Sequence, residues 1–93
     1  MISHQAFDHA AATARILQFV HQQLLNRPDA CDLQPEEDLL SSGAVDSLGV
    51  MRLVAFLEQE FSVSIAAEDV TMENFLHGAA IARLVARRLE MPS

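Results

Sequence analysis

Residues 43 to 61, GAVDSLGVMRLVAFLEQEF, decide the fold of this 93-residue chain. From Ser47 onward, large apolar side chains recur every three or four residues, which is the spacing of one face of an α-helix. This spacing predicts a helix over residues 47–61 whose apolar stripe faces a core. The stripe consists of Val50, Leu53, Val54, Leu57 and Phe61.

A second face of this helix carries side chains that do not belong to the stripe. At about 100° per residue, Leu48 and Met51 fall next to Ser47 and away from the core. Ala55 and Glu58 continue the same face toward the end of the helix. Two sizeable apolar side chains should therefore point outward beside a hydroxyl, and we interpret this face as a contact surface.

Another helix is predicted nearer the start of the chain, from about residue 5 to residue 26. Its apolar residues repeat the same spacing. We expect it to end near Asn26, because the ring of Pro28 disfavours helical geometry in the residue before it and its nitrogen cannot donate. The buried stripe consists of Thr13, Ile16, Leu17, Val20 and Leu24.

A long connection, residues 27–46, joins these two helices. It contains two Pro, one Gly and six acidic residues, so we expect a loop. Connections of this length within a compact domain are commonly functional. Four apolar residues can hold the loop onto the core: Leu33, Leu39, Leu40 and Val45.

A short helix is predicted after the 47–61 helix. Residues 62–65 alternate like a brief strand, but no second convincing strand could pair with them, so we expect an extended linker. Asp69 or Thr71 can then cap a short helix that ends at Phe75, because a side-chain oxygen there accepts from the unpaired amides of the first turn.

The last predicted helix begins at Gly78. His77 stands where a polar capping residue is common, so we expect this helix to fray or to begin late. Arg83 and Arg87 should face solvent. The buried stripe of this helix consists of Ile81, Leu84, Val85 and Leu89.

The composition agrees with this helical pattern. The chain is 51% hydrophobic and has five Phe but no Trp or Tyr, so its core must be largely aliphatic, which suits packed helices. We therefore predict an all-α fold in one domain, residues 1–93, with three main helices, a short third helix and a long loop between the first two.

The charge and the single cysteine narrow the class of protein. A net charge of -7 repels phosphate backbones and anionic headgroups, so neither nucleic acid nor a membrane is expected as a partner. No run reaches the roughly 18 apolar residues of a membrane span. Cys31 cannot form an internal disulfide, which favours a reducing compartment. We expect a cytoplasmic monomer.

Asp46 and Ser47 stand where a glycine-bearing loop becomes a helix. Asp or Ser in such a place is most often a simple helix cap, so the pair alone is a weak signal. The start of a helix also carries unpaired amides and about half a positive charge, which would favour an anion attached to Ser47.

Residues 38–75, DLLSSGAVDSLGVMRLVAFLEQEFSVSIAAEDVTMENF, resemble the acyl and peptidyl carrier protein family, with Asp46-Ser47-Leu48 as its D-S-L signature. The resemblance implies that the Ser47 hydroxyl receives 4'-phosphopantetheine from coenzyme A, added by a separate phosphopantetheinyl transferase. Asp46 would cap the helix and serve transferase recognition, and Leu48 would complete the attachment site. The terminal thiol of the arm would then carry cargo as a thioester.

Partner binding is expected from two regions, the 47–61 helix that follows the D-S-L signature and the segment that carries the short helix. We assign Phe75 to the core, because a lone aromatic ring between two helices usually fills their junction. Any cavity that takes up the arm should open between the 47–61 helix and the short helix. The expected partner-binding residues are Leu48, Met51, Arg52, Ala55, Val70 and Met72.

We predict no intrinsic catalysis and no metal site. An unactivated Ser47 hydroxyl needs a positioned base, and no His lies near it in sequence. The four His, which we expect to be solvated, have spacings that fit no metal-binding motif. A small enzyme is therefore the least supported reading.

The cargo is predicted from two departures from fatty-acid carriers. Such carriers usually show a strongly acidic second helix, whereas here Arg52 stands among only two acidic residues in the 47–61 helix. Gly43 lies four residues before Ser47 and not the commoner three, a pattern that resembles stand-alone aminoacyl or D-alanyl-type carriers. We expect an aminoacyl or peptidyl-type cargo, loaded by a separate ligase or adenylating enzyme and passed to a downstream acyl or aminoacyl transferase. One alternative is an acyl carrier for fatty-acid or polyketide synthesis. An alternative of another class is a non-enzymatic helical adaptor.

Overall fold

The computed structural model describes residues 7–24, 34–41, 43 and 45–90, and these residues form an all-helical fold. Four α-helices follow one another along the chain: α1 (His9–Phe19), α2 (Ser47–Phe61), α3 (Met72–Phe75) and α4 (Gly78–Glu90). A π-helical turn, Val20–Leu24, continues α1, and a 3-10 turn, Ala67–Asp69, precedes α3. The predicted class, with three main helices and a short third, is confirmed.

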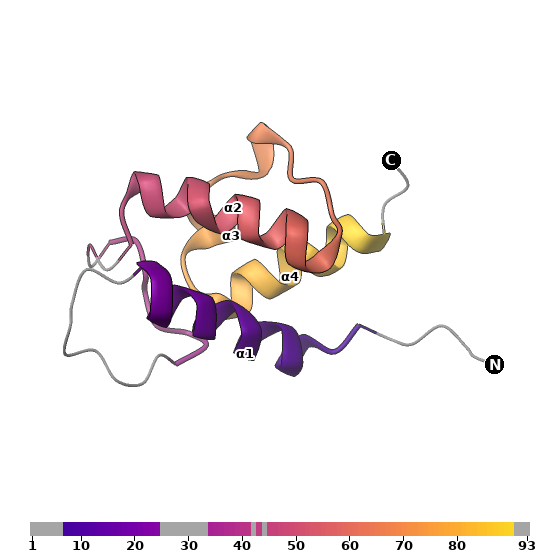
Figure 1. Ribbon diagram of the computed structural model, residues 1–93, viewed down its shortest axis with the longest axis horizontal. Coiled ribbons are helices and arrows are strands. Elements are labelled where there is room, and N and C mark those ends of the chain that lie inside the picture. Colours follow the sequence, from indigo (N-terminus) through magenta and orange to yellow (C-terminus); the bar gives the residue numbers. More distant parts are fainter. Residues whose placement is uncertain (1–6, 25–33, 42, 44, 91–93) are drawn as a thin grey trace.

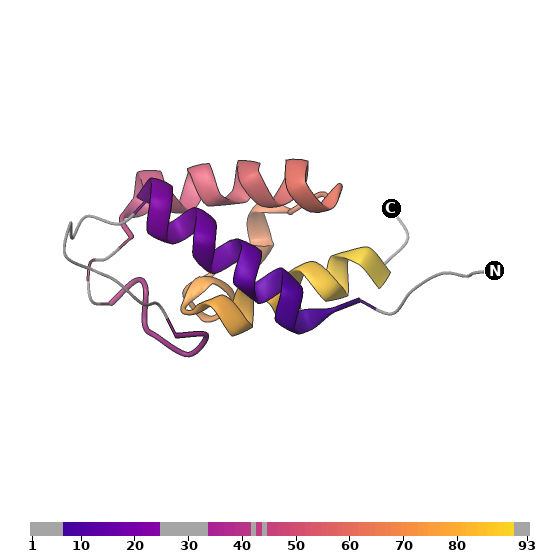
Figure 2. The same cartoon turned by 60° about the horizontal axis from the view of Figure 1, so that its bottom comes forward.

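The three longer helices lie around a common core. Figures 1 and 2 show α1, α2 and α4 side by side around it, with the connection after α2 arching back toward α3. The core is largely aliphatic, as the composition predicted, and Phe75 is its one large aromatic ring among the described residues. Its largest fully buried side chains are Phe75, Ile16, Leu39, Leu53, Leu57, Ile81, Leu84, Val20 and Val85.

Helix α1 begins later than predicted. Asp8 is its N-cap residue, and the Asp8 carboxylate accepts a hydrogen bond from the Ala11 amide at 3.0 Å. The helix therefore starts at His9 and not at residue 5. The predicted end near Asn26 lies outside the described residues, as does the predicted anchor Leu33.

The loop before α2 is attached to the start of α4. Leu39 and Val45 are buried, as predicted, and Leu40 is half-buried. The Leu39 amide donates to the Leu76 carbonyl oxygen at 2.7 Å, and the Ala79 amide donates to the Pro35 carbonyl oxygen at 2.9 Å. These two bonds connect the loop to the junction between α3 and α4.

Helix α4 corrects two predictions. It begins at Gly78 and not later, because His77 acts as its cap: the His77 Nδ1 atom accepts from the Ala80 amide at 3.1 Å. Leu89 was assigned to the buried stripe but is 46% exposed. The buried residues of α4 end at Ala86, so the last turn extends beyond the side chains that cover the earlier turns.

The segment between α2 and α4 follows the prediction closely. Residues 62–65 form no strand and contribute Ile65 to the core. Thr71 caps α3, since its hydroxyl oxygen accepts from the Asn74 amide at 3.1 Å. No helix within the described ranges is long and apolar enough to cross a lipid bilayer.

Candidate functional site

Ser47 is the first residue of α2, and its side chain is exposed. Asp46, in extended backbone geometry, is the N-cap residue: its Oδ1 atom accepts from the Gly49 amide at 2.8 Å. The first backbone hydrogen bond of the helix runs from the Val50 amide to the Asp46 carbonyl oxygen. The predicted capping role of Asp46 is therefore seen in the structure.

The beginning of α2 can stabilise an anion on the Ser47 hydroxyl. The amides of Ser47 and Leu48 precede the first helical hydrogen bond, so they point out of the helix end. A helix of 15 residues adds the positive end of its dipole at the same place. A phosphodiester linked to Ser47 would lie in this favourable field.

In the loop before α2, the side chain of Asp38 stabilises a backbone turn. The Asp38 carboxylate accepts from the Ser41 amide at 2.8 Å and from the Leu40 amide at 3.0 Å. These backbone bonds, that from Ser41 first, lower the pKa of Asp38 from its ordinary value of 3.8. Gly43 has a φ of +80°, a left-handed conformation that glycine adopts without strain.

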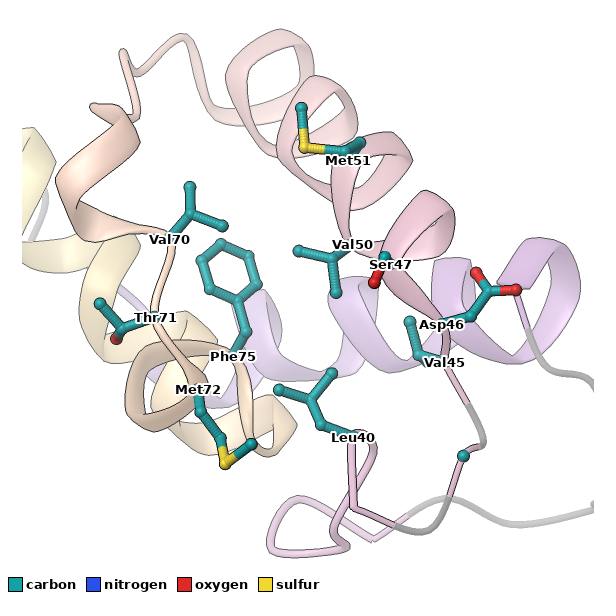
Figure 3. Close-up of a pocket in the computed structure, with 11 residues that line it drawn as sticks. Leu40, Val45, Asp46, Ser47, Val50, Met51, Val70, Thr71, Met72 and Phe75 are labelled. Atoms are coloured by element: carbon teal, nitrogen blue, oxygen red, sulfur yellow. The ribbon is translucent and has the colours of Figure 1, made fainter.

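A mainly apolar groove of about 580 Å³ opens next to Ser47. In Figure 3, Val50 and Met51 from α2 face Val70 and Phe75 across it, and Ser47 lies at its edge. The groove is therefore located where we expected a cavity, between α2 and the segment that carries α3. Its lining residues are Leu40, Gly43, Val45, Asp46, Ser47, Val50, Met51, Val70, Thr71, Met72 and Phe75.

Of the expected partner-binding residues, Met51, Val70 and Met72 line this groove, whereas Leu48, Arg52 and Ala55 lie outside its lining. Leu48, 70% exposed, and Met51, 61% exposed, project from the first turns of α2, where Arg52 and Ala55 are also exposed. Across the groove, Met72 is 64% exposed.

Two residues of the short-helix segment are less accessible. Val70 is half-buried and packs against the core, so part of its surface is structural. Phe75 is only 1% exposed, as predicted for a core residue, although one part of it still lines the groove.

Sequence reasoning missed some residues that shape the site. Leu40 and Thr71 line the groove but had been assigned only as a loop anchor and a possible cap. Arg88 was not singled out, yet its Nε atom donates to the Ser64 carbonyl oxygen at 2.8 Å and its guanidinium lies 3.6 Å from Asp69. Arg88 thus ties the segment that leads to Val70, a lining residue of the groove, to α4, and no pattern of nearby residues signals such a contact.

Groups suited to acid-base or metal chemistry are dispersed. Across the described residues, no three His, Cys, Asp or Glu side chains gather in a way that could hold a metal ion. His9 and His21 are exposed, as expected, whereas His77 is half-buried and engaged as a helix cap. The expectation that every His is solvated is therefore wrong for His77.

Comparison with known proteins agrees with this geometry. Residues 14–76 match the family described as "Phosphopantetheine attachment site", which covers more than half of the chain. The chain is also 29% identical, over 75 residues, to Aminoacyl carrier protein 2 of Bradyrhizobium diazoefficiens, an alignment that covers 81% of this chain and 83% of the relative. Members of this family carry a covalent 4'-phosphopantetheine group. The chain belongs to the acyl and peptidyl carrier proteins, the family defined by the phosphopantetheine attachment site.

Proposed function

We propose that Ser47 is the attachment residue for 4'-phosphopantetheine and that the loaded arm presents a thioester to separate enzymes. The observation that carries this proposal is the exposed Ser47 hydroxyl at the start of α2, beside an apolar groove. Asp46 caps the same helix and would help the transferase recognise the site. The chain itself acts as a tether, and the chemistry belongs to its partners.

The proposed cargo is an aminoacyl or peptidyl-type group. The name of the relative in B. diazoefficiens supports this choice, because that protein is an aminoacyl carrier. A separate ligase or adenylating enzyme would form the thioester, and a downstream acyl or aminoacyl transferase would remove it. Both would approach through the exposed residues Leu48, Met51, Arg52, Ala55 and Met72 and the accessible part of Val70.

A second candidate cargo is an acyl chain for fatty-acid or polyketide synthesis. The groove beside Ser47 favours it, because about 580 Å³ of mainly apolar space can take up a hydrocarbon chain of modest length. Both candidates require the same attachment at Ser47, so they differ only in the enzyme that loads the arm.

Intact-mass spectrometry tests the attachment. The purified chain is incubated with coenzyme A, Mg²⁺ and a promiscuous phosphopantetheinyl transferase. We expect the mass to increase by one phosphopantetheinyl group in the wild type and in Ser64→Ala, a matched exposed serine, but not in Ser47→Ala. An unmodified wild type would instead favour a helical adaptor, in which the Asp46-Ser47 turn is only a cap.

Thioester formation tests the cargo. The modified protein is offered to a panel of aminoacyl ligases and acyl ligases, each with ATP and its substrates. We expect an aminoacyl thioester that is released by hydroxylamine. Loading by acyl ligases alone would replace the aminoacyl proposal with the acyl one, while leaving the attachment at Ser47 intact.

A further inference from the structure

The charged side chains of α2 differ in what they contact. The helix carries three of them: Arg52, Glu58 and Glu60. The Glu58 Oε2 atom accepts from the Ile65 amide at 2.9 Å, and the Glu60 Oε2 atom lies 3.0 Å from Arg15 Nη2. Both carboxylates of α2 are thus engaged in contacts within the chain, which reduces what they can offer to a partner.

Arg52 is the charge of α2 that lies on the proposed docking surface. At about 100° per residue it falls on the same side of the helix as Leu48 and Ala55, and all three are exposed. The guanidinium makes one hydrogen bond in the described part of the chain, from Nη1 to the Gln23 carbonyl oxygen at 3.2 Å. Because a guanidinium has five N–H donors, the donors not bonded to Gln23 can still reach an external acceptor.

An aromatic pair extends this surface from α2 onto α1. The rings of Phe19 and Phe56 stack with their centroids 4.1 Å apart and their planes 11° from parallel. Both rings and Arg52 line a shallow recess of about 280 Å³. The recess is lined by Phe19, Arg52, Ala55, Phe56 and Gln59. We call these five residues together with Leu48 the Arg52 face.

We propose that the enzyme that loads the arm docks on the Arg52 face with an acidic surface, an inference that rests on the proposed carrier function. A carboxylate of the enzyme pairs with Arg52, and an apolar side chain of the enzyme enters the recess lined by Phe19 and Phe56. Charge complementarity carries this assignment, since a guanidinium fork binds a carboxylate in a bidentate manner. A basic enzyme surface at this place would face a like charge.

Loading kinetics test the proposal with the phosphopantetheinylated protein and the ligase that loads the wild type. We expect Arg52→Glu to raise the KM for the carrier at least about tenfold, which corresponds to about 1.4 kcal/mol. Arg52→Lys should retain part of the affinity. Arg83→Glu, the same change of charge at an exposed position of α4, should leave the KM unchanged.

Salt dependence separates docking from a structural role of Arg52, whose bond to Gln23 also supports the end of the first helix. Because the chain as a whole carries a net charge of -7, the two proteins are compared at each salt concentration: we expect the difference in KM between the wild type and Arg52→Glu to shrink as ionic strength rises. Replacement of the acidic ligase residue that pairs with Arg52 by Arg should restore loading of the Arg52→Glu variant. A merely structural effect would lower the unfolding midpoint and would show neither the salt response nor the rescue.

A measurement without the enzyme tests the acidic docking partner independently of the proposed aminoacyl cargo. Backbone amide relaxation is recorded in the presence of a carboxylate-bearing or an amine-bearing pyrrolidine nitroxide. The carboxylate-bearing probe should enhance amide relaxation more in residues 48–55 than in residues 66–73, compared with the amine-bearing probe. Arg52→Glu should abolish this preference of residues 48–55.

The outcomes are distinct. Equal KM values for Arg52→Glu and Arg83→Glu would overturn the acidic-partner proposal, as would a preference of residues 48–55 for the amine-bearing nitroxide. Failure of every aminoacyl ligase to load the modified wild type would overturn the proposed cargo instead, and the nitroxide measurement would still decide the polarity of the face.

Discussion

The two halves of α2 differ in how far their side chains are used by the fold. The half next to Ser47 exposes Leu48 and Met51, whereas the other half places Leu57 in the core and engages Glu58 and Glu60 within the chain. The half next to Ser47 thus leaves two large apolar side chains open to a partner, whereas the other half, apart from the part of the Arg52 face formed by Ala55, Phe56 and Gln59, is used mainly by the fold. Substitutions in the two halves should therefore affect different properties.

The largest expected difference is between two leucines of α2. Leu57 is fully buried, so Leu57→Ala should lower the free energy of unfolding by about 2–5 kcal/mol through lost burial and a residual cavity. Leu48→Ala should change it by less than about 0.5 kcal/mol, because that side chain is mostly exposed. Urea unfolding of both variants measures the difference, and similar losses at the two positions would refute the division of α2.

The capping residue is expected to contribute less than the core. Asp46→Ala removes the acceptor of the Gly49 amide and should lower the free energy of unfolding by about 1 kcal/mol. Asp46→Asn keeps a side-chain oxygen acceptor and should retain most of that stability. Thermal unfolding of the two variants makes the comparison. Equal destabilisation by Ala and Asn would show that the negative charge, and not the hydrogen bond, matters at this position.

The ion pair at the far end of α2 should contribute less still. The Arg15 and Glu60 side chains are substantially exposed, so solvent screens their attraction. A double-mutant cycle of Arg15→Gln and Glu60→Gln should give a coupling free energy of about 0.2–1 kcal/mol that decreases in high salt. A larger coupling that salt does not change would mean that the pair is a structural lock and not a surface contact.

The smallest effect is expected in the loop before α2 and only in acid. The backbone amides of Ser41 and Leu40 hold the pKa of Asp38 below its ordinary value, so the folded state binds this proton less readily than the unfolded chain. The stabilisation is complete above pH 3.8 and is lost as the pH falls through the lower pKa of the folded state. Asp38→Asn should remove this part of the acid dependence, as measured by urea unfolding between pH 2 and pH 6. An unchanged slope would contradict it.

The sequence was sufficient for the elements whose signals are local. The start of α2 followed from a capping Asp and an apolar stripe that begins directly after it. Thr71 before α3 gave a similar signal. The start of α1 was missed because the Asp8 cap precedes a run of small residues rather than the apolar stripe. Leu89 was misassigned because periodicity does not show where neighbouring elements stop covering a helix.

Contacts between distant residues could not be predicted in the same way. His77 can cap α4 only with one ring nitrogen turned toward the Ala80 amide, and the residue type alone does not fix that orientation. The groove is lined by Leu40 and Thr71, which the fold brings to it from separate segments. Arg88 reaches Ser64 over 24 positions of sequence. Each of these features follows from the tertiary arrangement, whereas the D-S-L signature could be read directly.

The bond between Leu39 and Leu76 has a mechanical consequence. The Leu39 carbonyl oxygen also accepts from the Val45 amide, two residues before Ser47, while Leu76 directly follows α3. Ser47, the proposed attachment residue, and one wall of the neighbouring groove therefore rest on a shared backbone support. A displacement of α3 that widened the groove would therefore also act on the backbone that positions Ser47, and under the proposed function the uptake and the presentation of cargo would be coupled.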